Sequence, residues 1–295
     1  MKTIIVPTDF STCADNAAHY AVQLAKVLKT DIKLCNAFLV PSETELADTV
    51  VWPLEDYDSI KDGVNRQLHR AADKLSIEEK IEPKKAAYPR IDFTCRPGTV
   101  PDVVKEIVNT KDAPLVVMGM SGAGALSRLF LGSNSRDMIE NADFPLLLIP
   151  PETTYKRVKK IAFATDLNPH DLEIIYSLAS FAKNFNAEIL IAHITDEKYD
   201  APKYQKKTDN FLSDVTCKAN YDKIYYRHVK SMDVAHGLDW ICEHSFSDMI
   251  VMSHGKHNII DAFFGGSYTQ KLARHVNIPL MVYPKNIRSS ALIAF

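Results

Sequence analysis

The residues of this chain best suited to chemistry lie between positions 117 and 135, where an apolar strand ends in glycines and a helix begins on Gly-Ser. The spacing is G-x2-G-x9-G-S, running from Gly119 through Gly122 to Gly132 and Ser133. Glycines let the backbone turn sharply and approach a ligand, and the first N–H groups of a helix attract anions. The pattern therefore predicts a phosphate-binding loop. The alternative is a glycine-rich loop that merely turns the chain.

Other sequence signatures of nucleotide binding and catalysis do not occur. There is no glycine-rich turn after the first strand and no G-x4-G-K-[ST] anywhere. No G-x-S-x-G elbow supports nucleophilic catalysis, and residues 117–135 hold no His or Glu that could act as a general base. His254, His257, Cys242 and His244 fit no recognised zinc spacing, so we expect no metal ligands among them. Catalysis is not indicated.

The composition is that of a globular chain with two cores. It has 295 residues, of which 46% are hydrophobic and 24% charged, and a formal net charge of −2. This charge gives no basis for binding nucleic acid or an anionic membrane, so small molecules and proteins are the expected partners. The start of the chain lacks a secretory apolar region, no run is long enough to span a membrane, and five scattered cysteines suggest free thiols. A cytoplasmic location is expected.

The chain contains an internal repeat. Residues 4–9 match residues 161–166 at an offset of 157, and residues 113–118 match residues 247–252 at an offset of 134. The second copy has therefore lost 23 residues from its middle. A polar stretch after Pro150-Pro151 separates the copies, which predicts domains at 1–152 and 153–295.

Each copy alternates strands and helices, which is typical of a parallel sheet with crossover helices. In the first copy we expect strands near 3–8, 31–37, 90–95, 115–118 and 145–149, and helices near 14–28, 60–80, 101–108 and 133–142. The acidic run from Asp102 to Glu106 reads as a helix surface, and Tyr225, Tyr226 and Trp240 read as core or interface residues. The tail at 286–295 has no assigned role.

The first strand, Ile4-Ile-Val-Pro-Thr-Asp-Phe-Ser11, and the G-x2-G-x9-G-S spacing together resemble the universal stress protein family, in its ATP-binding branch. The resemblance covers nearly the whole chain and implies a tandem two-domain member. The implied fold is α/β, with two tandem domains, each a five-stranded mainly parallel sheet with helices on both faces. It also implies that the domains pair through their final strands as an internal pseudo-dimer. A homodimer of the whole chain is left open.

The family's nucleotide contacts can be carried over residue by residue. The aspartate that meets adenosine becomes Asp9, with Pro7 and Thr8 beside it, and the backbone contact to adenine becomes Ala37. The resemblance implies that the ribose and phosphates are wrapped by Met118, Gly119, Ser121 and Gly122, and that phosphate oxygens bind Gly132, Ser133, Asn134 and Ser135. From the residues alone, Asp9 could instead cap a helix and Ala37 could be a core residue.

The loop departs from the family pattern in lacking the usual His or Lys, since it reads Met120-Ser-Gly-Ala123 and its nearest cation is Arg128. ATP affinity would then depend on backbone donors, with Mg²⁺ as a candidate for screening the triphosphate. The second copy keeps Asp166 but reads Met252-Ser-His-Gly255, without the glycine expected after Met252. We therefore interpret it as a degenerate packing partner, with ATP binding there as the alternative.

The expected function is that of an ATP-binding regulator in a stress response, without clear catalytic residues. Two alternatives stay open at this point. One is a slow ATPase or phosphotransfer enzyme, and the other is a scaffold that binds a non-nucleotide anion or a lipid.

Overall fold

The computed structural model describes residues 2–39, 57–82, 88–110, 113, 115–120, 132–195, 201–254 and 278–284. In the first half the elements alternate as expected: β1 (Thr3–Pro7), α1 (Thr12–Leu28), β2 (Asp31–Phe38), α2 (Tyr57–Glu78), β3 (Ile91–Pro97), α3 (Val100–Thr110), β4 (Leu115–Gly119), α4 (Ser133–Asn141) and β5 (Leu146–Ile149). In the second half they are β6 (Lys160–Thr165), α5 (Asp171–Phe185), β7 (Glu188–Thr195), α6 (Ala201–Lys218), β8 (Ile224–Lys230), α7 (Val234–His244), β9 (Met249–Ser253) and β10 (Leu280–Tyr283).

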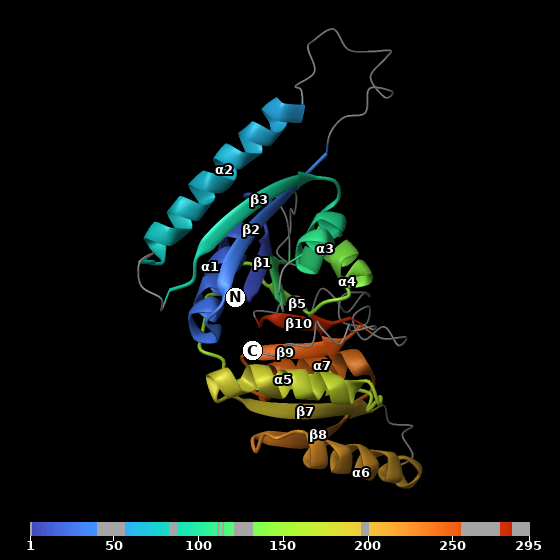
Figure 1. Ribbon diagram of the computed structural model, residues 1–295. Helices are drawn as coiled ribbons and strands as arrows, with labels where there is room; N and C mark the ends of the chain where they lie inside the picture. The colour runs from blue at the N-terminus through green and yellow to red at the C-terminus, as the bar shows by residue number, and fades with distance from the viewer. Residues whose placement is uncertain are drawn as a thin grey trace, which may run out of the picture.

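The described strands form one continuous sheet in the order β3-β2-β1-β4-β5-β10-β9-β6-β7-β8 (Figure 1). Its first five strands come from the first half and its last five from the second. Read from the outer edge of the sheet inward, the two halves have the same strand order. All pairs within a half are parallel, whereas β5 and β10 pair antiparallel, with Met281 opposite Leu147. This confirms the expected α/β fold of two tandem five-stranded domains and their pairing through the final strands.

The helices cover both faces of the sheet. Buried residues of α1, α2, α5 and α6 form one cluster with the sheet, buried residues of α3, α4 and α7 form a second, and Ile241 of α7 belongs to a small third cluster with residues of β6, β7 and β8. Each of the first two clusters draws residues from both halves, because β5 and β10 carry the sheet across the junction. The strands read as nearly unbroken apolar runs, as parallel strands covered on both faces should.

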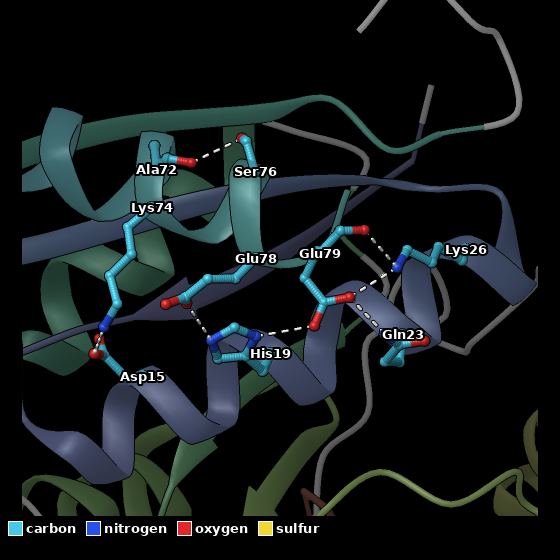
Figure 2. Close-up of polar contacts among 9 residues, drawn as sticks. All are labelled: Asp15, His19, Gln23, Lys26, Ala72, Lys74, Ser76, Glu78 and Glu79. Carbon is cyan, nitrogen blue, oxygen red and sulfur yellow. Dashed lines mark hydrogen bonds and ion pairs between the residues drawn. The ribbon is translucent and has the colours of Figure 1, made fainter. Parts of the chain in front are cut away.

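Helix α1 shows how the sequence sets an element and its neighbours. Its apolar residues recur at three and four positions and are buried, Ser11 caps its first turn, and it ends at Lys29 in the left-handed conformation. Its polar face binds the end of α2 (Figure 2): Glu79 accepts hydrogen bonds from Lys26 Nζ at 2.7 Å and pairs with His19 Nδ1 at 2.9 Å. These contacts hold α2 on the sheet beside β3.

The junction between the halves is held by specific contacts as well as by β5 and β10. The amide of Asn16 on α1 donates to the carbonyls of Pro150 and Thr153, at 3.3 and 3.1 Å. Tyr20 packs edge-on against Tyr155, with ring centroids 5.1 Å apart. The first helix of the first domain therefore contacts the segment that leads into the second domain through hydrogen bonds and a ring contact.

None of the helices in the described ranges combines the length and apolar character needed to cross a membrane. Tyr225, expected in the core or an interface, is 52% exposed on the edge strand β8, because alternate residues of an edge strand face opposite sides.

Candidate functional site at the carboxyl edge of the sheet

The strand order places a topological switch point between β1 and β4. From β1 the chain crosses to β2 on one side, and β4 lies on its other side. Ligands of open parallel sheets bind outside the carboxyl ends of the strands at such a point. Most of the described candidate residues follow the carboxyl ends of β1, β2 and β4, and we call this region the switch-point edge.

The turn between β1 and α1 is built from side chains that bond its own backbone. Thr8 Oγ1 accepts from the Phe10 N–H at 3.0 Å, and Phe10 has a φ of 61°. The Asp9 carboxylate accepts from the Ser11 N–H at 3.1 Å and from its hydroxyl at 2.5 Å, and Ser11 Oγ accepts from the Ala14 N–H. Ser11 is therefore the helix cap. Asp9 supports the cap while its side chain remains exposed at the edge.

The end of β2 is fastened to the same turn. Thr8 N–H donates to the Cys35 carbonyl and the Asn36 side-chain amide donates to the Thr8 carbonyl, both at 2.8 Å. Pro7 and Thr8 are buried, and the adjacent Ala37 is half-buried against the α3 side of the sheet. Sequence reasoning missed Asn36 and Ser11. A polar residue within an apolar strand and a serine just before a helix were the signals that could have identified them.

Gly119 at the end of β4 lies against the start of α1. A Cβ added there would lie 2.9 Å from the Cys13 carbonyl oxygen, so only glycine lets the two backbones come this close. Met118, the residue before it, is buried among the apolar side chains under α3 and α4. The structure thus brings the start of α1 and the end of β4 into contact.

The two ends of the glycine loop are closed on each other. Gly132 N–H donates to the Met120 carbonyl at 2.8 Å, and the Ser135 hydroxyl lies 3.1 Å from the carbonyl oxygens of both Gly119 and Met120. Ser135 is 2% exposed. These two donors therefore hold the start of α4 to the end of β4, and their role as phosphate ligands stays a prediction.

The first turn of α4 presents donors at this edge. Ser133 and Asn134 are exposed, and no side chain caps the helix at Gly132. The first N–H groups of a helix have no partner within the helix, so those of residues 133–135 are suited to an anion. Ser121 and Gly122, together with Arg128, lie outside the described residues.

The second half repeats the β1–α1 turn, but it has a serine, Ser253, at the position equivalent to Gly119. Leu167 N–H donates to Thr165 Oγ1 at 2.8 Å and Asn168 N–H to Asp166 Oδ1 at 3.1 Å, as in the first half. Ser253 replaces Gly119, and its side chain bonds the buried carboxyl of Asp171, which also accepts from the Thr165 hydroxyl at 2.5 Å. Burial raises the pKa of Asp171 to about 6. A polar cluster therefore occupies this part of the second half.

The packing of strand against helix also differs between the two halves at a pair of equivalent positions. Ile194 stands where the first half has Ala37, and Gly237 of α7 stands where α3 has Val103. A Cβ at Gly237 would collide with the Ile194 side chain, so a larger residue on the strand is balanced by a smaller one on the helix. The second glycine loop lies within residues 255–277, outside the ranges that the structure describes.

Comparison with known proteins identifies a family and several relatives that match this chain. A sequence model described as the universal stress protein family matches residues 1–150 and 157–284. Universal stress protein MJ0531 of Methanocaldococcus jannaschii is 28% identical over 148 residues, covering 50% of this chain and 81% of that protein. A universal stress protein of Thermus aquaticus, encoded in the QAH/OAS sulfhydrylase 3′ region, is 28% identical over 154 residues, covering 50% of this chain and 98% of that protein.

A solved structure is similar over the full length. The crystal structure of a universal stress protein from Archaeoglobus fulgidus superposes with a TM-score of 0.64, covering 96% of each chain at 15% identity. At that identity the likeness concerns the fold, and it extends to both halves together.

Proposed function

Because this chain belongs to the universal stress protein family in both halves, we propose that it binds ATP at the switch-point edge of its first half and acts as a nucleotide-dependent regulator. In this proposal the adenosine lies near Asp9 and Ala37. The triphosphate lies against the first turn of α4, where the N–H groups of Ser133 and Asn134 donate to it. Mg²⁺ would screen the remaining phosphate charge.

The observation that carries the proposal is the closed loop end. Hydrogen bonds from Gly132 and Ser135 place the uncapped start of α4 directly beside the end of β4. Gly119 in turn lies against the first residues of α1. A helix N-terminus, a carboxylate and two strand ends therefore share one edge, which is the arrangement that anionic ligands of open parallel sheets use.

The same reasoning assigns ATP to the first half rather than the second. The second half keeps the Thr165-Asp166 turn, but Ser253 and Asp171 form a polar cluster where the first half has a bare glycine and Ala14. A carboxyl beside the position of the phosphates would oppose a polyanion whenever it is ionised. We propose that this half serves chiefly as a packing partner through β5 and β10.

Mass spectrometry of the ligand released from the purified, denatured protein tests the proposal and its alternatives. We expect ATP, bound in a ratio of about one per chain after incubation with Mg²⁺-ATP and desalting. Conversion of the bound ATP to ADP over hours would instead favour a slow ATPase. A protein that retains no nucleotide after this incubation would refute the proposal and favour a scaffold for another anion or a lipid.

A further inference from the structure

A second hollow with the chemistry of an anion site lies between the edge strand β8 and helix α7. It has a volume of about 270 Å³ and is lined by Arg227, His228, Val229, Lys230, Ser231, His236 and Trp240. None of these lining residues is acidic, and Arg227 and Lys230 are exposed. None of them belongs to the switch-point edge or to its counterpart in the second half. We call this hollow the β8–α7 cleft.

Arg227 is held in place by an aromatic ring. Its guanidinium lies over the ring of Trp240, with its central carbon 4.5 Å from the centroid, and Trp240 also stacks on His244 with centroids 5.0 Å apart. A guanidinium stacked by its face keeps the N–H groups of its edge for a bidentate contact with phosphate. The stack therefore reduces the side-chain freedom that anion binding would otherwise have to remove.

His236 is oriented in a similar way. Asp233 caps α7 by accepting from the His236 N–H at 2.9 Å, and its second oxygen pairs with His236 Nδ1, also at 2.9 Å. This contact fixes the orientation of the imidazole beside the cleft. The pair is close to neutral when His236 is protonated, and the net positive charge of the cleft comes from Arg227 and Lys230.

The repeat shows that the fold does not require this charge. The strands β3 and β8 align at an offset of 133 and the helices α3 and α7 at 134, so the residues equivalent to Arg227, Lys230, His236 and Trp240 are Thr94, Pro97, Asp102 and Glu106. In the first half this surface is acidic: Glu106 pairs with Arg96, and Asp102 accepts from the Thr99 hydroxyl. Two copies of one unit thus carry opposite charge at the same place, in accord with a separate role for the basic copy.

We propose that the β8–α7 cleft binds a small phosphorylated anion. Arg227 binds two phosphate oxygens through the edge of its guanidinium, and Lys230 adds a second positive charge. The volume is just below the roughly 300 Å³ at which pockets for larger ligands begin, so a compact anion fits better than a whole nucleotide. The site is independent of the proposed ATP site.

The test uses inorganic pyrophosphate and the fluorescence of Trp240. The chain has two tryptophans, Trp52 and Trp240, so the W52F variant of the full-length protein leaves Trp240 as the single reporter. We expect a saturable change in fluorescence as pyrophosphate is added. The dissociation constant should rise at least tenfold in the double variant R227Q/K230Q, and also between low and 0.5 M salt.

A matched substitution in the first half is the control. R96Q removes a half-buried arginine from the acidic counterpart surface and should leave the dissociation constant within twofold of the parent value. Circular dichroism checks that R227Q/K230Q is folded, as expected because both side chains are exposed. A fluorescence change that is absent, or that R227Q/K230Q leaves unaltered, overturns the proposal. Retention of ATP is measured in the same variants and should not change, which separates this site from the one at the switch-point edge.

Discussion

Replacing Gly132 by aspartate tests the proposed phosphate site without disturbing the helix that forms it. Gly132 is the N-cap of α4, with a φ of −61° and a ψ of 156°. Aspartate adopts this conformation readily and is among the best N-cap residues, differing from glycine by only a few tenths of a kcal/mol in stability. G132D should therefore fold, with a melting temperature within a few degrees of the parent protein.

The same substitution places a carboxylate where the phosphates are proposed to bind. Its oxygens would accept from the N–H groups of Asn134 or Ser135, which are among the donors that a phosphate needs. Two unit charges about 5 Å apart at an effective dielectric constant of about 20 repel by roughly 3 kcal/mol. We therefore expect G132D to bind Mg²⁺-ATP at least a hundredfold more weakly, as measured by titration calorimetry.

The matched control is G132N, which has nearly the same shape and capping ability but no charge. It should lose much less affinity than G132D, and G266D in the second half should have little effect. The reasoning is refuted if folded G132D binds ATP within about threefold of the parent protein. An equal loss in G132N would show that charge at the start of α4 is not the cause.

Three further substitutions test other parts of the account. S135A removes the hydroxyl that bridges the carbonyls of Gly119 and Met120. It should lower the free energy of unfolding in urea by about 1 kcal/mol and speed ATP dissociation several-fold. An unchanged rate of ATP dissociation would mean that contacts other than this hydroxyl hold the ends of the loop together. Burial alone would raise the pKa of Glu79, but hydrogen bonds from Lys26 and His19 outweigh it and lower the pKa. Its contribution to stability is thus present above about pH 4.5 and lost as the pH falls through the lowered pKa, so E79Q should cost about 2 kcal/mol at pH 7, and this cost should shrink as the pH is lowered below about 4.5. The pKa of Asp171, raised by burial from 3.8 to about 6, makes the folded state bind its proton more tightly, so stability falls as the pH rises from 4 to 6. D171N should remove that slope and stabilise the protein at pH 7 by up to about 3 kcal/mol, whereas a slope that persists in D171N would assign it to other groups.

The elements of the first half were predictable because their signals are local. The apolar period of α1 and the apolar runs of β1, β2 and β4 each specify their own structure, and the ends of these elements differ from prediction by no more than three residues. The repeat added the second half, because an offset of 157 carries β1 and β2 onto β6 and β7, and an offset of 134 carries β4 and β5 onto β9 and β10. The pairing of the final strands β5 and β10 was predicted from the family resemblance, since no local pattern specifies which edges meet, and its antiparallel direction is seen only in the structure.

The site was less predictable, because its bonds join residues far apart in the sequence. The sequence suggested that Ser135 and Gly132 face phosphate, whereas in the structure their donors close the loop on the main chain of Gly119 and Met120. It suggested Asp9 as a ligand or a cap, and the structure shows it supporting the cap that Ser11 makes. Asn36, which fastens β2 to the turn, shows in the sequence only as a polar residue within an apolar strand, and that signal does not say what it contacts. Such roles depend on tertiary contact, which periodicity does not report.

The most direct test of the account is a crystal structure of the chain grown with excess Mg²⁺-ATP. We predict triphosphate oxygens within hydrogen-bond distance of the main-chain N–H groups of Ser133 and Asn134, and the adenosine beside Asp9 and Ala37. An edge that stays empty, or that is filled by side chains of the chain itself, would contradict the central claim.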